Sequence, residues 1–267
     1  MPATSCATPF PSSRWTDVTA PEPGPFTFGE LLGRAWEMYR REPWLFLLLT
    51  AVTVVPVGIL SAIATNAASG AGDIARAGAI VGIALIPAIL LLPVSGAAVA
   101  IATVRRLDGD AVGAGAALEK VGVRFWILFG ALVLVTLGVI VGLFALVLPG
   151  IFLAILWLFA GQAVVIEDTG VRDALRRSQD LVRGAWWTVF LAWILIQVVT
   201  AIAQLAIGIV GAVILSPLDG TALAWGEGIW STLTQVVTQP FALIAIALLY
   251  ADRVLRVDGR LPGPPGR

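Results

Sequence analysis

Long stretches of this sequence carry no charged residue, and each stretch is apolar almost throughout. No Asp, Glu, Lys or Arg occurs in five runs: 43–72, 77–104, 125–166, 184–218 and 228–251. A helix needs about 20 apolar residues to cross the roughly 30 Å of hydrocarbon in a bilayer. Four of the runs have room for one crossing each. The run 125–166 has room for two, separated by a turn at Leu148-Pro149-Gly150. The pattern therefore predicts six membrane-spanning helices.

The predicted spans cover residues 44–66, 77–104, 125–147, 151–167, 185–215 and 228–251. A shorter helix precedes each odd-numbered span, at 27–41, 110–123 and 170–183, because apolar residues recur there at the spacing of one helical face. Each pair of spans ends near a turn, at Asp108-Gly109, Asp168-Thr169-Gly170 or Asp258-Gly259. We expect the glycine at each turn to supply the positive φ that closes a helix.

These patterns predict an all-α fold: a six-transmembrane-helix bundle built as three repeats of a cytoplasmic amphipathic helix and a transmembrane hairpin. The alternative is that any hairpin-built membrane protein shows the same basic segments and interfacial tryptophans. Residues 1–25 contain six prolines and are expected to form a disordered cytoplasmic tail. The membrane domain then covers 26–258, and 259–267 forms a second disordered tail.

The basic residues of the chain are distributed unevenly between the two sides of the predicted membrane. Lys and Arg near helix ends stay in the cytoplasm. All of them except Arg76 lie in the segments before odd-numbered spans or after even-numbered ones. Tryptophans lie at the starts of spans 1, 3, 5 and 6, where amphipathic rings prefer the membrane interface: Trp44, Trp126, Trp186, Trp187, Trp225 and Trp230. We predict that both termini are cytoplasmic, in the plasma membrane of a bacterium.

Composition narrows the classes of function. The chain is 58% hydrophobic and 13% charged, about half the charge of a soluble domain, and its net charge is zero. Membrane lipids are therefore expected partners, whereas nucleic acid is not. The chain has no histidine and one cysteine, Cys6. This composition removes the commonest general base and the usual zinc ligands, so we predict that the protein is not an enzyme and takes no metal or cofactor.

The predicted spans hold a few amide side chains and no charged ones. These amides are Gln162, Gln197, Gln204, Gln235 and Gln239. Gln197 and Gln204 are seven residues apart and Gln235 and Gln239 are four apart, so each pair shares a helical face. Amides within a membrane form interhelical hydrogen bonds of about 0.6–2 kcal/mol. The five residues are a candidate intramembrane polar network, and the alternative is that they line a polar cavity for a substrate.

The most distinctive cytoplasmic segment follows span 4. Two acidic residues precede a helix start, where the helix dipole favours them, and arginines follow one and two turns later. The candidate interaction surface comprises Glu167, Asp168, Arg172, Asp173, Arg176, Arg177, Ser178 and Arg183. One interpretation is an ion-pair lock that holds the interfacial helix. The other is a site for a lipid headgroup or a protein partner.

Six segments of the chain carry a resemblance to a known family: residues 28–39, 148–157, 164–167, 174–178, 181–186 and 248–256. They resemble the bacterial family named for the membrane domain of glycerophosphoryl diester phosphodiesterase, and the similarity runs from Thr27 to Asp258. The resemblance implies a helical multi-pass membrane protein. It does not imply the phosphodiesterase reaction, because that chemistry belongs to a separate soluble barrel with histidines and a divalent metal.

Three functions fit the sequence. The first is a non-enzymatic membrane scaffold or accessory protein, which the missing catalytic residues and the structured cytoplasmic face favour. The second is a transporter or permease for a small molecule or lipid, which the prolines and amides within the spans favour. The third is a membrane component of glycerophosphodiester or lipid metabolism, which follows from the resemblance alone.

Overall fold

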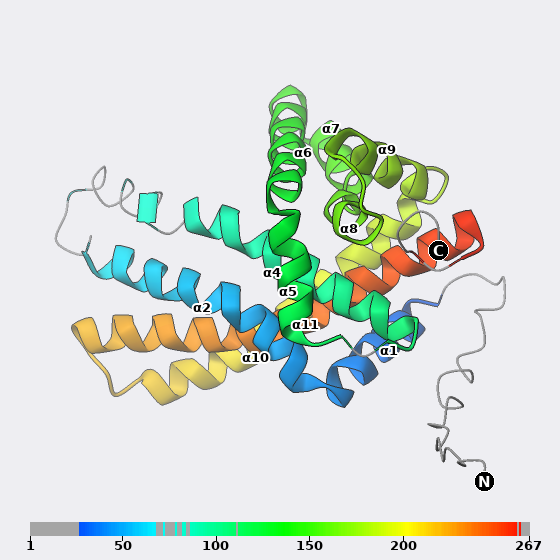
Figure 1. The fold of residues 1–267 in the computed structure, drawn as a ribbon. Coiled ribbons are helices and arrows are strands. Elements are labelled where there is room, and N and C mark those ends of the chain that lie inside the picture. Colours follow the sequence, from blue (N-terminus) through cyan, green and yellow to red (C-terminus); the bar gives the residue numbers. More distant parts are fainter. Residues whose placement is uncertain are drawn as a thin grey trace, which may run out of the picture.

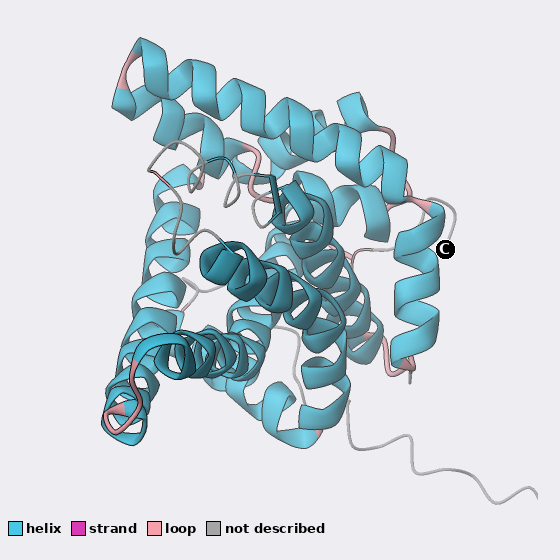
Figure 2. Cartoon of the chain, turned by 90° about the vertical axis from the view of Figure 1, so that its left-hand side faces the viewer, coloured by secondary structure: helices cyan, strands magenta, loops and turns pink. Residues whose placement is uncertain are grey.

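A computed structural model describes residues 27–67, 72, 78, 82–83, 86–110, 112–260 and 262. The tail of 1–25, most of the tail of 259–267 and the beginning of the second predicted span lie outside these residues. The described residues form helices and no strand, as Figures 1 and 2 show. In chain order the helices are α1 (Phe28–Arg41), α2 (Pro43–Ala67), α4 (Ile86–Leu107), α5 (Ala114–Val123), α6 (Phe125–Ala145), α7 (Val147–Leu156), α8 (Ala160–Ile166), α9 (Val171–Val182), α10 (Trp186–Leu215) and α11 (Gly220–Asp258).

The all-α fold and the long apolar helices are confirmed. Within the described residues, six helical segments are long and apolar enough to cross a membrane, with α7 and α8 together forming the fourth. The short helices α1, α5 and α9 each precede two of these segments. Their buried residues lie on the helical faces that the spacing of apolar residues predicted. Examples are Leu31, Ala35 and Tyr39 of α1 and Ala174 and Leu181 of α9.

Helix α11 lies at the centre of the arrangement. It contacts α1, α2, α4 and α10, and α2 also contacts α4. In Figure 1, α2, α4, α10 and α11 extend in the same general direction, whereas α6 stands at a steep angle to them. Helix α6 packs mainly on α7 and is apolar all round, so its sequence gives it no preferred face toward the other spans. The expected single bundle is therefore split into a group around α11 and a hairpin of α6 and α7.

The core is built largely from small side chains. Alanines of α4 and α11 are buried where these helices meet, and close backbone approach of this kind is common between membrane helices. The three largest fully buried side chains are those of Tyr250, Phe46 and Phe159. The first part of α11 is far more exposed than the rest, since its buried residues begin at Thr234.

The turn expected at Leu148-Pro149-Gly150 is wrong, because α7 already begins at Val147. The chain reverses instead at Leu146, whose backbone is extended. Pro149 is tolerated in the first turn of α7 because the N–H groups of a first turn have no intrahelical acceptor. Gly150 serves close packing, since a Cβ there would lie 2.5 Å from a side-chain carbon of Leu143 in α6.

The expectation of a positive φ at each turn glycine is confirmed at Gly109 and Gly259 and is wrong at Gly170. Gly109 has φ 84° and Gly259 has φ 68°. In the middle turn the positive φ belongs to Asp168, at 56°, and Gly170 is the extended residue before α9. Asp is one of the few residues that adopt this conformation readily, because its short side chain bonds locally.

The fourth span is not continuous, because α7 ends at Leu156 and α8 begins at Ala160. The Ser178 hydroxyl of α9, which is fully buried, donates to the Leu156 carbonyl at 2.8 Å. The same oxygen accepts from the Phe159 N–H at 3.1 Å. A backbone group left without a partner inside a membrane protein is costly, so one serine makes the interruption tolerable.

Replacing Ser178 by alanine should destabilise the protein. The substitution leaves a buried carbonyl and a buried N–H without their partner, at a cost of about 1–3 kcal/mol. The measurement is the thermal unfolding midpoint of the purified protein in mild detergent. Ser216→Ala is the matched control, because the Ser216 hydroxyl is exposed and bonds only to Val213 in its own helix. Equal midpoints for the two variants would contradict this role of Ser178.

Candidate functional site

The candidate site lies where the α8–α9 connection meets the end of α11. The Arg177 guanidinium of α9 lies between two carboxylates from distant parts of the chain. Its Nε is 2.8 Å and 3.1 Å from the two oxygens of Glu167, just after α8. Its Nη1 is 3.2 Å from Asp258 Oδ1 at the end of α11, and Nη2 pairs with the other oxygen. Tyr250 of α11 donates its hydroxyl to Glu167 Oε1 at 2.6 Å. We call Glu167, Arg177, Tyr250 and Asp258 the Arg177 cluster.

The cluster is mostly removed from solvent. The side chains of Glu167, Arg177 and Asp258 are 13%, 19% and 20% exposed, and Tyr250 is fully buried. Burial alone would lower the pKa of the Arg177 guanidinium. Its hydrogen bonds to Asp258 and Glu167, together with their negative charge, outweigh the burial and raise this pKa above its ordinary value. Arg177 therefore stays charged, and the planar fork of its guanidinium suits two carboxylates.

The neighbouring Asp168 is held by a second set of contacts. Its carboxylate is 3.1 Å from Arg124 Nε, between α5 and α6, and 3.6 Å from Lys120 Nζ of α5. Arg124 also donates to the Thr169 carbonyl at 3.2 Å. These contacts fix the connection before α9 in the conformation that gives Asp168 its positive φ. The far end of α9 is held as well, since Arg253 Nε of α11 donates to the Leu181 carbonyl at 3.0 Å.

The predicted interaction surface is divided by this arrangement. Glu167, Asp168 and Arg177 are engaged in the contacts above, and Ser178 is buried at the break in the fourth span, so it is not a surface residue. The other members are exposed on the outward side of α9: Arg172, Asp173, Arg176 and Arg183. Arg172 and Arg176 lie one turn apart on the helix, and Arg183 is the residue that follows its last turn. No ion pair is found for these three within the described part of the chain.

Several residues of the Arg177 cluster and of the contacts to Asp168 were not predicted from the sequence. Tyr250 and Asp258 lie more than 80 positions from their partners, and Lys120 and Arg124 about 45 positions from theirs. Periodicity within one helix gives no information on such pairings. The one available signal was the polar end of α11, where Tyr250 to Asp258 interrupts an otherwise apolar helix.

The five amides do not come together as one network. Gln162 of α8 is buried and Gln239 of α11 is half-buried, and the Oε1 atom of each has no hydrogen-bond partner among the described residues. Gln197 is exposed on α10 and Gln235 on α11. Gln204 Nε2 donates to Thr238 Oγ1 at 3.2 Å, which links α10 to α11 through a hydroxyl and not through another amide.

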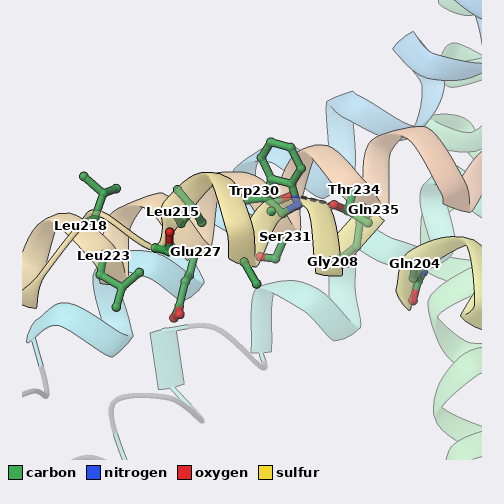
Figure 3. Close-up of a pocket in the computed structure, with 13 residues that line it drawn as sticks. Gln204, Gly208, Leu215, Leu218, Leu223, Glu227, Trp230, Ser231, Thr234 and Gln235 are labelled. Carbon is green, nitrogen blue, oxygen red and sulfur yellow. Dashed lines mark hydrogen bonds between the residues drawn. The ribbon is translucent and has the colours of Figure 1, made fainter. Parts of the chain in front are cut away.

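Gln204 and Gln235 instead line an open groove between α10 and α11 (Figure 3). The groove has a volume of about 650 Å³ and lies toward the ends of the two helices that are joined by residues 216–219. Its wall includes one carboxylate, Glu227. Trp230 stands between the helices, with its indole N–H donating to the Ile207 carbonyl at 3.1 Å. A Cβ at Gly211 would lie 2.1 Å from that indole nitrogen, so the glycine makes room for the ring.

The described residues contain no group of three or more His, Cys, Asp or Glu side chains placed to hold a metal ion. The three carboxylates of the candidate site face two guanidinium groups, an ammonium group and a phenol. This charge-balanced arrangement suits a structural lock between helices.

Arg177→Gln should destabilise the protein, because it leaves Glu167 and Asp258 partly buried without their counter-charge. We expect a loss on the order of 2–3 kcal/mol, somewhat less than for a fully buried pair. The comparison is the thermal unfolding midpoint in mild detergent against Arg176→Gln, which removes the same charge from the exposed side of α9. The control should stay within about 0.5 kcal/mol of the unmodified protein. A control that loses as much as Arg177→Gln would show that net charge matters and the cluster does not.

Comparison with known proteins yields one family. No curated protein and no solved structure matches the chain. One family model matches residues 28–255, which include every helix named above except the last turn of α11. The match covers the Arg177 cluster apart from Asp258. The chain therefore belongs to the family described as Domain of unknown function (DUF7847).

Proposed function

We propose that this protein is a six-span bacterial plasma-membrane protein, with both termini in the cytoplasm, that acts as a non-enzymatic scaffold or accessory protein. Its working surface is the outward side of α9, which carries Arg172, Asp173, Arg176 and Arg183. The observation that carries the proposal is the fixed position of α9. The Arg177 cluster and Ser178 bind the inner side of this short helix, and Arg253 binds its far end. Arg124 and Lys120 hold the connection before it, while its outer side is left exposed.

The arrangement of charge supports the proposed orientation. Ion pairs join residues of the segments that carry most of the basic side chains: Arg106 with Glu42, Arg124 with Asp168 and Arg177 with Asp258. These segments thus meet at one end of the molecule, as a common cytoplasmic side requires. The tryptophans at the starts of α2, α6 and α10 are well exposed, at 79% for Trp44, 78% for Trp126 and 69% for Trp187. Exposed rings at these positions suit the headgroup region of a membrane.

The contacts of the acidic residues favour a structural role over acid–base chemistry. A catalytic carboxylate needs access to its substrate and a pKa suited to proton transfer. Glu167 is bound by Arg177 and Tyr250, and Asp168 by Arg124 and Lys120. Groups held in this way fix helices relative to one another. A rigidly presented face of mixed charge is the property that a docking protein needs, because pre-organisation lowers the cost of binding.

Two other functions remain predictions from the sequence. Transport of a small molecule or lipid requires a pathway across the membrane, and the groove between α10 and α11 offers a binding surface at one end of a hairpin. A role in glycerophosphodiester metabolism rests on the resemblance to the membrane domain of the phosphodiesterase. The repeat of three units is also a prediction, and the order of short and long helices is consistent with it.

The proposal is tested by photocrosslinking in the native membrane. Benzoylphenylalanine placed at position 172, 176 or 183 should give the same discrete protein adduct, because the three exposed positions lie along the outer side of α9 and at its end. The matched control is position 137, since Leu137 is 54% exposed on the apolar helix α6 and should crosslink to lipid. Charge reversal by Arg172→Glu in a protein that carries the probe at 176 should weaken the adduct several-fold. Lipid adducts alone from all three α9 positions would refute the proposal.

A further inference from the structure

The two helices of the final hairpin are longer than a membrane requires. α10 has 30 residues and α11 has 39, so at 1.5 Å per residue they measure about 45 Å and about 58 Å. The hydrocarbon layer is about 30 Å thick. A tilt of ~40°, at the upper end of the usual range, still leaves α10 with a vertical extent of about 34 Å. The hairpin therefore extends beyond the hydrocarbon at one end or the other.

The Arg177 cluster indicates which end projects. The charged residues Asp252 to Asp258 of α11 belong to the end that holds this cluster, so the hydrocarbon begins near Ala251. About 20 residues are needed to cross it, which places the other boundary near Thr232. The residues of α11 just before Thr232, and those of α10 that face them, then lie at the level of the lipid headgroups, and the hairpin end near Gly220 projects past them. The groove extends across this boundary, from Gln235 on its hydrocarbon side to Leu223 near the loop.

The two walls of the groove differ in chemistry. Glu227, Ser231 and Gln235 follow one another at i, i+4 and i+8 along α11, so they form a polar stripe. Figure 3 shows the Glu227 and Ser231 side chains directed to the same side. Across from them α10 contributes the small residues Gly208, Gly211 and Ala212, and leucines border the loop end: Leu215, Leu218 and Leu223. The groove thus offers polar groups beside apolar surface.

The groove is formed before any ligand binds. Trp230 keeps α10 and α11 apart, because its ring fills the space over Gly211 and its N–H is bonded to the Ile207 carbonyl. The volume of about 650 Å³ is within the range of roughly 300–1,000 Å³ that small-molecule sites occupy. On the outside of α10, next to the groove, Leu205 and Ile209 are 66% and 59% exposed. An alkyl chain can lie against these two side chains.

We propose that this groove binds the headgroup of a phospholipid that carries a primary amine. The ammonium group lies at Glu227, the one charged side chain of the groove wall, and donates hydrogen bonds to its carboxylate. The Gln235 amide, which is exposed, donates to the phosphate, and the acyl chains lie along Leu205 and Ile209. A primary amine is favoured over a quaternary one because only the primary amine supplies N–H donors. An anionic headgroup without an amine is repelled by Glu227.

The test uses the full-length protein in nanodiscs that contain equal amounts of phosphatidylethanolamine and phosphatidylglycerol. Bound lipid is counted by native mass spectrometry after release from the disc. The unmodified protein should retain phosphatidylethanolamine in excess. Glu227→Gln should reduce this preference about two- to fivefold, a modest factor because the carboxylate is exposed to solvent. Asp219→Asn is the matched control, since Asp219 lies on the same loop side, is exposed and makes no side-chain cap bond.

A second variant tests the groove independently of charge. A Cβ at Gly208 meets nothing within 4 Å, so Gly208→Leu introduces its side chain into the groove from an open position. This variant should lose the retained phosphatidylethanolamine, while the control keeps it. Full retention by Glu227→Gln and Gly208→Leu would overturn the proposal, and so would equal retention of the two lipids by the unmodified protein. A negative result would leave the role proposed for α9 unaffected, because the two surfaces share no residue.

Discussion

The paired contact of the Arg177 guanidinium with Glu167 and Asp258 joins the end of α11 to the connection between α8 and α9, which lies about 80 residues earlier in the chain. One carboxylate belongs to the end of the fourth span, the other to the end of α11, and the arginine to the short helix between the fourth and fifth spans. Because all three side chains are largely withdrawn from water, each depends on the others for its counter-charge. The position of α9, and with it the surface that α9 presents, follows from this contact.

Satisfaction of buried polar groups explains the rest of the arrangement around α9. The break between α7 and α8 leaves the Leu156 carbonyl and the Phe159 N–H without intrahelical partners, and Ser178 bonds to both. The end of α9 leaves carbonyls without intrahelical donors, and Arg253 bonds to one of them. Irregular backbone is tolerated in a membrane protein only where protein or water satisfies it. The polar residues of α9 and α11 therefore permit an interrupted span, which a purely apolar sequence would not support.

The regular elements were predictable because they depend on local pattern. The length of the uncharged runs predicted the six apolar helices, and the spacing of apolar residues predicted the buried faces of α1, α5 and α9. Proline and glycine at 149 and 150 misled the prediction of the turn, because a proline in the first turn of a helix and a glycine at a close contact look the same in sequence as a loop.

The site was predicted in part. Glu167 and Arg177 are ten residues apart and were recognised together, whereas Tyr250, Asp258 and Arg124 could not be assigned without tertiary contacts. The amides were predicted to meet on the basis of shared faces, but a shared face does not fix which neighbour a helix meets.

The central place of α11 has a consequence for biogenesis. Helices α1, α2, α4 and α10 all pack on it, yet the ribosome releases it after every one of them. Until α11 leaves the insertion machinery, these earlier helices lack the helix on which all four pack, although α2 already contacts α4. Over the same period Arg177 and Glu167 are without Asp258 and Tyr250. The contacts that join the earlier helices through α11 are therefore the last to form. Final assembly is then a late and cooperative event, triggered by the arrival of one helix.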